Sequence, residues 1–313
     1  MAEQSFQSRA GAKLLPFVAK RVFPSSWLDA GDNRGRLVHI AKQRRRLDGP
    51  RPDLVIQRTW NRATTEIDGS ELHLLTPKTG STGRLLFYCH GGAFVVGPSA
   101  IEWLFATRVA SELGYDLALF DYPKVPEVNS STIMAATMDA YELLTERYDP
   151  TQFVMTGMSA GGGLAASLML QLARAGKSQP AACLLVSPWL DMTISHPDAT
   201  SADRTDHLLP LNLLRRDGQL YAAERNPKDP LVSPRFMAAA EFAKMAPTVV
   251  VAGERELLLG EATEYVTNLS QAGASSTLVV EPYGQHAGVL SPTPEGSQAL
   301  DRALSELKSH LRT

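Results

Sequence analysis

The chain has 313 residues, and its 31 Lys and Arg side chains nearly balance its 33 Asp and Glu side chains, for a formal net charge of −2. This balance argues against a nucleic-acid binder, whose affinity rests on neutralising phosphates, and a hydrophobic content of 44% excludes a disordered chain. The two cysteines, Cys89 and Cys183, are too few for a disulfide framework or a four-cysteine zinc site.

The first fifty residues are predicted to be helical and show no secretory leader. Residues 13–23 alternate apolar and basic side chains, as in a basic amphipathic helix, which we expect to pack on its own domain rather than on a membrane. The basic run 42–46 is expected to be a solvated helix face. No run approaches the roughly 18 apolar residues of a spanning helix, so no membrane insertion and a cytoplasmic location are predicted.

Beyond residue 50, apolar runs of strand length alternate with helical segments. An antiparallel hairpin at a sheet edge is predicted from 56–62 and 71–76 around the turn Asp68-Gly69. Six further strands are expected at 85–89, 117–121, 153–157, 183–187, 248–252 and 277–281. Helices are expected at 101–113, 132–147, 162–175, 260–272 and 295–311. Continuously apolar strands between helices indicate an α/β fold with a parallel sheet covered on both faces.

Two segments do not follow this alternation. Residues 1–50 precede the sheet, and residues 192–246 interrupt it with Pro-rich loops and short helices. Ligands of an open α/β sheet bind beyond the carboxyl ends of the strands. We therefore predict a core of residues 51–191 and 247–313, with 1–50 and 192–246 as two parts of a cap over that end.

Ser159 is the predicted nucleophile. It stands in the G-x-S-x-G motif of residues 157–161, after an apolar strand and before a helix. This motif forms a sharp strained turn that exposes the serine hydroxyl, and its glycines are needed because side chains would clash there. Ala160 then offers its backbone N–H, at the start of a helix, to a developing oxyanion. A glycine-rich turn that binds phosphate is the alternative interpretation.

The segment His90-Gly91-Gly92-Ala93-Phe94 follows another predicted strand. Tandem glycines at this place let backbone N–H groups approach a ligand closely. In α/β-hydrolases the further oxyanion donors come from a loop at this position. His90 precedes the glycines and is expected to brace the loop rather than to act as the base.

The base and its acid must follow Ser159 along the chain. His286 is the preferred base because it lies in a glycine-flanked loop after the last strand, whereas His196 and His207 lie in the irregular segment and His310 in the last helix. A carboxylate must orient the imidazole. The loop after the strand at 248–252 offers Glu256, with Glu254 as the alternative and Asp191 or Asp203 as further candidates.

These motifs resemble those of one known family. HGGAF at 90–94, DYPKVPE at 121–127, GMSAGG at 157–162, SPWLD at 187–191, GEREL at 253–257 and GQHAG at 284–288 occur in the order and spacing of the hormone-sensitive-lipase-like (HSL-type) carboxylesterases of the α/β-hydrolase superfamily. The resemblance runs from about residue 80 to the C-terminus.

The resemblance implies a mostly parallel eight-stranded sheet with a helical cap, the triad Ser159, His286 and Glu256, and an oxyanion hole formed by the N–H groups of Gly91, Gly92 and Ala160. It also implies a small-molecule ester as substrate, no cofactor, no metal, and a homodimer as a common assembly. The departures are HGGA for the commoner HGGG, tolerable if Ala93 has an ordinary φ, a changed supporting loop at 121–127, Met158 for an Asp or Thr, and a glutamate for the usual aspartate.

The predicted function is hydrolysis of short- to medium-chain acyl esters through an acyl-enzyme on the serine. An amidase or acyltransferase with the same triad is the alternative, and a ligand-binding receptor on a hydrolase scaffold is the third interpretation. Candidate pocket residues are apolar side chains close to the motifs, for which core packing is the other interpretation: Phe94, Trp103, Met158 and Trp189.

Overall fold

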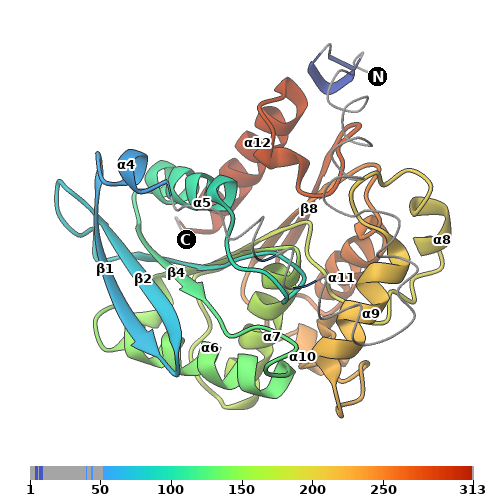
Figure 1. The fold of residues 1–313 in the computed structure, drawn as a ribbon, viewed down its shortest axis with the longest axis horizontal. Coiled ribbons are helices and arrows are strands. Elements are labelled where there is room, and N and C mark those ends of the chain that lie inside the picture. The colour runs from blue at the N-terminus through green and yellow to red at the C-terminus, as the bar shows by residue number, and fades with distance from the viewer. Residues whose placement is uncertain (1–3, 6, 10–39, 41–43, 45–51, 312–313) are drawn as a thin grey trace.

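The computed structural model describes residues 4–5, 7–9, 40, 44 and 52–311. Its centre is a single eight-stranded sheet in the order β1-β2-β4-β3-β5-β6-β7-β8 (Figure 1). The strands are β1 (Trp60–Ile67), β2 (Ser70–Pro77), β3 (Leu85–Cys89), β4 (Asp116–Asp121), β5 (Phe153–Met158), β6 (Ala182–Val186), β7 (Thr248–Gly253) and β8 (Ser276–Glu281). Pairs β1–β2 and β2–β4 are antiparallel, and all other neighbouring pairs are parallel.

The six continuously apolar strands lie where the sequence predicts them, to within one residue at either end. The edge hairpin also forms, around Asp68-Gly69, but its first strand begins at Trp60 rather than at residue 56. Ile56 instead ends the short helix α4 (Asp53–Ile56) and is buried in the core. The apolar character of Ile56 therefore reflects helix packing and not strand alternation.

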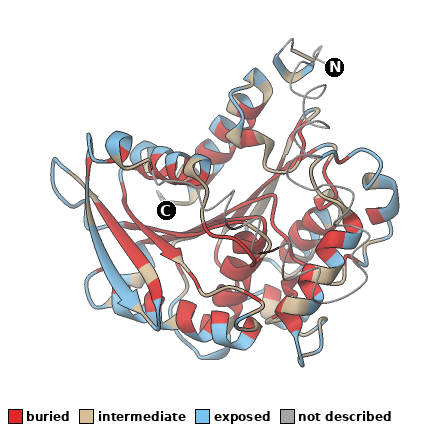
Figure 2. Cartoon of the chain, in the orientation of Figure 1, coloured by how far each residue is buried: buried red, intermediate tan, exposed pale blue. Residues whose placement is uncertain are grey.

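Helices cover both faces of the sheet (Figure 1). Helices α5 (Ala100–Leu113) and α12 (Pro294–His310) lie on one face, and α6 (Ser130–Thr145), α7 (Ala160–Arg174) and α11 (Leu259–Gln271) lie on the other. Figure 2 shows that the central strands are buried along their whole length. Alternate side chains of β3 illustrate this, because Leu86 and Tyr88 pack under α5 while Phe87 and Cys89 pack under α7.

Residues 192–246, all of which the structure describes, contribute no strand and contain α8 (Ala199–Ala202), α9 (Leu211–Ala222), the short helix η2 (Pro234–Phe236) and α10 (Ala239–Phe242). Of the expected cap helices of residues 1–50, only residues 4–5, 7–9, 40 and 44 are described, so the predicted amphipathic helix at 13–23 lies outside the described residues, as does the basic run 42–46 apart from Arg44. The expected core and cap division of the chain stays a prediction. Among the described residues, no helix is long and apolar enough to cross a membrane.

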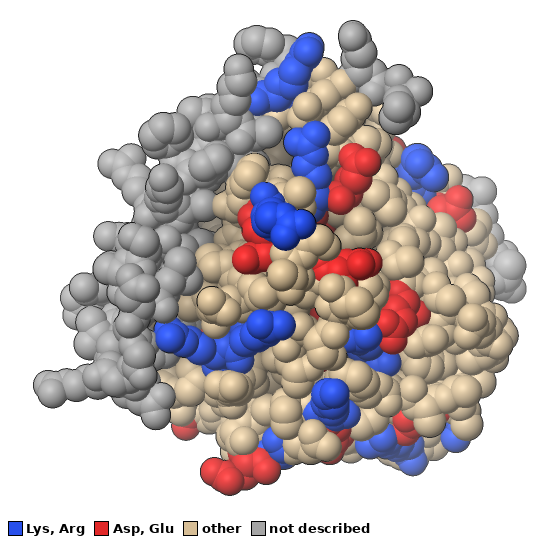
Figure 3. All heavy atoms as spheres, turned by 90° about the vertical axis from the view of Figure 1, so that its right-hand side faces the viewer, with Lys and Arg blue, Asp and Glu red and all other residues tan. Residues whose placement is uncertain are grey.

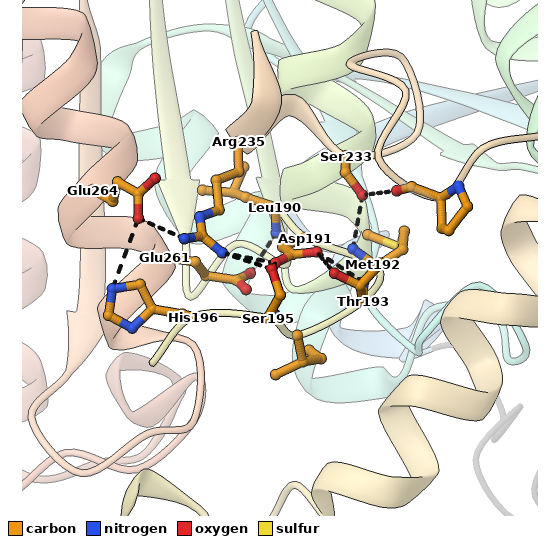
Figure 4. A network of polar contacts seen from close by, with 12 residues as sticks. Leu190, Asp191, Met192, Thr193, Ser195, His196, Ser233, Arg235, Glu261 and Glu264 are labelled. Atoms are coloured by element: carbon orange, nitrogen blue, oxygen red, sulfur yellow. Dashed lines mark hydrogen bonds and ion pairs between the residues drawn. The ribbon is translucent and has the colours of Figure 1, made fainter. Parts of the chain in front are cut away.

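A buried ionic network fastens residues 192–246 to the core (Figure 4). Arg235 donates to Asp191, which follows β6, at 2.8 Å and to Glu264 of α11 at 2.7 Å. Asp191 also accepts from the backbone and hydroxyl of Ser195, and His196 lies 3.8 Å from Glu264. Because the carboxylate of Asp191 is fully buried, its loss of hydration is compensated only while these donors stay in place.

Candidate active site

Ser159 stands on a strained turn between β5 and α7. Its φ of 54° and ψ of −121° lie outside the regions that side-chain-bearing residues usually adopt. The turn is tight: a Cβ at Gly157 would collide with the carbonyl oxygen of Gly161, and a Cβ at Gly161 with the carbonyl oxygens of Cys89 and His90 at the end of β3. Ala160, the first residue of α7, uses its N–H in no hydrogen bond within the described residues.

His286 and Glu256 come together beside this turn. Nδ1 of His286 lies 3.8 Å from Oε2 of Glu256; the side chain of Glu256 is fully buried and that of His286 is 10% exposed. Ser187, directly after β6, links the two loops: its hydroxyl donates to Glu256 Oε2 at 2.6 Å and accepts from the N–H of Ala287 at 2.9 Å. Sequence reasoning missed Ser187, although it opens the SPWLD motif; its φ of 45° is visible only in the structure.

The alternative acids and bases have other partners. Glu254 accepts from the N–H of Tyr283 at 2.7 Å, and Asp203 accepts from the N–H of Leu211 at the start of α9. Asp191 and His196 belong to the Arg235 network of Figure 4. The backbone of His207 donates to a glutamine side chain of the 286 loop. The geometry therefore favours Glu256 and His286 among the candidates.

Burial shifts the pKa of both groups toward the uncharged form. It raises the pKa of Glu256 to about 8, against the hydrogen bond from Ser187, which lowers it. It lowers the pKa of His286 to about 4. The neutral imidazole is the form that can accept a proton from a serine hydroxyl.

Two side chains fix the first peptide plane of the loop after β3, the peptide between His90 and Gly91. The N–H of Gly91 donates to Oε1 of Glu102 at 2.6 Å, and the carbonyl of His90 accepts from the Tyr122 hydroxyl at 2.7 Å. The N–H of Gly91 is thus already engaged away from Ser159. This differs from the predicted oxyanion set, in which Gly91 is a donor.

The next two peptides, Gly91–Gly92 and Gly92–Ala93, have their carbonyl groups engaged, while their N–H groups have no hydrogen-bond partner in the part of the chain that the structure describes. The carbonyl of Gly91 accepts from Nδ1 of His90 at 2.6 Å, and the carbonyl of Gly92 accepts from the N–H of Val95 at 2.9 Å. In a trans peptide the N–H points opposite to the C=O, so the N–H groups of Gly92 and Ala93 point away from these partners. No hydrogen bond within the described residues uses either group. The φ of Ala93 is 53°, so the ordinary φ on which the tolerance of alanine at this position depends is absent.

These groups meet at one apolar cavity of about 280 Å³. Gly92, Ala93, Met158, Ser159 and His286 line its base. Leucines and a proline of residues 208–214 form much of its wall: Leu208, Leu209, Pro210, Leu213 and Leu214. Met158, one of the candidate pocket residues, thus lines this cavity, and its contact with a substrate stays a prediction.

The three aromatic candidates lie elsewhere. Phe94 stacks on Tyr221 at 3.8 Å between ring centroids, Trp189 donates its indole N–H to the carbonyl of Asp191, and Trp103 projects from α5 onto His73 of β2. All three are at most 1% exposed, and none is among the lining residues. Large aromatic side chains near a motif are good core material, which outweighs their proximity in sequence.

The family model for the alpha/beta hydrolase fold matches residues 86–290, about two thirds of the chain. The chain belongs to the alpha/beta hydrolase fold family. The expected family and fold are thereby confirmed, with the serine motif, the His286 loop and the loop after β3 all inside the matched segment.

Similar proteins carry related names. This hydrolase is 30% identical over 194 residues to an esterase of Acinetobacter venetianus, a match that spans 61% of the chain and 63% of that protein. It is 28% identical over 230 residues to an acetyl-hydrolase of Streptomyces hygroscopicus, spanning 72% and 76%. A crystal structure of an esterase from the bacterial hormone-sensitive lipase family superposes with a TM-score of 0.78 at 24% identity, covering 99% of the chain and 100% of that structure.

The face of the hydrolase that carries α8, α9 and α11 has no large area of one charge. Figure 3 shows acidic and basic side chains interspersed on this side of the molecule. Within the part of the chain that the structure describes, no three His, Cys, Asp or Glu side chains are grouped so as to hold a metal ion.

Proposed function

We propose that this hydrolase is a serine carboxylesterase that cleaves short- to medium-chain acyl esters. One observation carries the proposal: Ser159 and His286 line the same apolar cavity as Gly92 and Ala93, whose N–H groups have no hydrogen-bond partner within the described residues. The names of the similar proteins, esterase and acetyl-hydrolase, support the same chemistry.

The reaction proceeds in two acyl transfers. Ser159 attacks the ester carbonyl while His286 takes its proton, and the developing oxyanion is received by the N–H groups of Gly92, Ala93 and Ala160. His286 then protonates the leaving alcohol. In the second half, His286 activates a water that attacks the acyl-serine and releases the acid. Glu256 holds the imidazole in the orientation that both halves require.

The leucines of residues 208–214 define the substrate class. They supply apolar contact for an acyl chain, worth about 0.8 kcal/mol for each buried methylene. A cavity of about 280 Å³ accommodates a chain of several carbons and not a long fatty acid. A neutral ester also suits a pocket whose base and walls are largely apolar.

The test is hydrolysis of p-nitrophenyl esters from acetate to decanoate by the wild type and by Ser159→Ala. The variant is expected to lose turnover while keeping its fold, and wild-type kcat/KM is expected to peak at short to medium chains. Ser167→Ala is the matched control, because Ser167 lies on α7, is also buried and is not among the residues that line the cavity. Substantial turnover by Ser159→Ala contradicts the proposal, and faster cleavage of matched anilides points to an amidase.

We further propose a cytoplasmic location, with which two buried and unpaired cysteines are compatible, and a homodimer. Cell fractionation tests the first proposal. Analytical ultracentrifugation tests the second, and a single monomeric species contradicts it.

A further inference from the structure

Glu102 is a buried carboxylate outside the triad that the mechanism above does not use. It lies in the first turn of α5, is only 4% exposed, and belongs to the capping box of that helix. Oε1 accepts from the N–H of Gly91 at 2.6 Å. Oε2 accepts from the N–H of Ser99 at 3.0 Å and from its hydroxyl at 3.1 Å. One carboxylate thus ties together residues 91 and 99, the two ends of the loop that leads from β3 to α5.

The Tyr88 hydroxyl near Glu102 is a further hydrogen-bond donor to its carboxylate. The hydroxyl of Tyr88 lies 3.5 Å from Oε1. Burial, followed by the charge of Glu102, holds the pKa of Tyr88 well above its ordinary value, so this hydroxyl stays protonated and donates. A buried carboxylate with this many donors has a fixed position, because rotating it would leave a charge unpaired.

The peptide that Glu102 holds sets the direction of the next ones. With the N–H of Gly91 on Glu102 and the carbonyl of His90 on Tyr122, the first plane is fixed at both ends. The chain then reverses at Gly92, whose φ is 103°, and at Ala93. A Cβ at Gly92 would meet the side chain of Val96 at 2.5 Å, so this reversal requires glycine at position 92.

We propose that Glu102 is the positioning residue of the oxyanion hole: by holding the N–H of Gly91 out of the site, it aims the N–H groups of Gly92 and Ala93 at the oxygen bound beside Ser159. This inference rests on the proposed esterase function. It predicts that Glu102 acts on the transition state through the loop and makes no contact with the substrate, since Glu102 does not line the cavity.

The test compares Glu102→Gln with Glu261→Gln. Glu261 is a matched control because it is also buried and accepts a backbone N–H, that of Leu190, at 2.6 Å, away from the loop after β3. An amide at position 102 can accept on one side only, so either Gly91 or Ser99 loses its acceptor. Loss of one oxyanion donor costs about 10²–10³ in kcat, and partial misalignment is expected to cost Glu102→Gln about tenfold or more.

The measurements are kcat and KM for p-nitrophenyl butyrate and the inhibition constant of a trifluoromethyl ketone, which forms a tetrahedral adduct with the serine. For Glu102→Gln we expect kcat to fall and the ketone to bind more weakly by a similar factor, with KM changed less than about twofold. Glu261→Gln is expected to keep kcat and ketone affinity. A folded Glu102→Gln with wild-type kcat and ketone affinity overturns the assignment.

Two further arms keep the outcome decisive. If Glu102→Gln does not fold, Glu102→Asp replaces it, because the shorter side chain keeps the charge but is unable to reach both Gly91 and Ser99; a wild-type kcat in that variant overturns the assignment as well. If the wild type cleaves no ester, or Ser159→Ala stays active, the proposed function fails independently of Glu102.

Discussion

Replacing Ser187 by Ala tests how the acid and the base are held together. Ser187 is 1% exposed. Its hydroxyl donates to Glu256 Oε2 at 2.6 Å and accepts from the N–H of Ala287 at 2.9 Å. Its removal leaves a buried carboxylate without that donor and a backbone N–H without that acceptor. Ala287, which follows His286, thereby loses its link through Ser187 to Glu256.

The magnitude follows from these two contacts. Leaving a buried polar group unsatisfied costs about 1–3 kcal/mol, so the free energy of unfolding is expected to fall by that amount. The hydrogen bond from Ser187 lowers the pKa of Glu256, which burial has already raised to about 8. Its loss raises this pKa further, and less of the acid is ionised at neutral pH. Since an unoriented imidazole is a poor base, we expect kcat to fall about 10- to 100-fold.

The assay is the pH dependence of kcat/KM for p-nitrophenyl butyrate, together with urea unfolding. Because the pKa of Glu256 rises, the ascending limb of the profile is expected to move to higher pH in Ser187→Ala. Ser167→Ala is the control for removing a buried hydroxyl, since Ser167 is also 1% exposed and its hydroxyl has no hydrogen-bond partner within the described residues. A Ser187→Ala profile that superposes on that of Ser167→Ala would refute the linking role.

Two other predictions concern the acid and the acyl pocket. A carboxyl whose pKa is raised on folding, as for Glu256 from 4.5 to about 8, contributes stability below its ordinary pKa and loses it as the pH rises through the folded value. We therefore expect the free energy of unfolding of Glu256→Gln, minus that of the wild type, to be larger at pH 9 than at pH 5 in urea unfolding. If this difference is the same at both pH values, the raised pKa is contradicted. Leu214→Trp is expected to fill part of the cavity and to lower kcat/KM for octanoate about tenfold or more while sparing acetate. Leu143→Trp, on the exposed side of α6, is the control, and equal losses for both esters would show that the acyl chain binds elsewhere.

The sheet could be predicted from the sequence because its strands are buried on both faces. A strand such as 153–158 has no solvent-facing side, so its composition alone distinguishes it from a loop or an amphipathic helix. The serine turn was equally predictable, since the collisions that a Cβ at Gly157 or Gly161 would cause leave glycine as the residue that fits. The start of β1 could not be predicted, because Ile56 is apolar for packing as part of a helix and not as part of a strand. The leucines that line the cavity could not be predicted either, because they come from a segment without a motif.

The orientation of the loop after β3 shows where sequence reasoning ends. Two adjacent glycines indicate that a peptide plane can turn toward a ligand, but they do not say which plane turns. The first plane is held by groups 11 and 32 residues away along the chain, the carboxylate of Glu102 and the hydroxyl of Tyr122, while the N–H groups of the second and third planes have no hydrogen-bond partner within the described residues. Ala93 adopts a φ of 53°, a conformation that costs a side-chain-bearing residue about 1–3 kcal/mol. This strain persists because the contacts on either side of it are buried and mutually fixed. The orientation of these peptide planes, on which the proposed oxyanion donors depend, is thus a property of the folded neighbourhood, and the HGGA motif alone does not encode it.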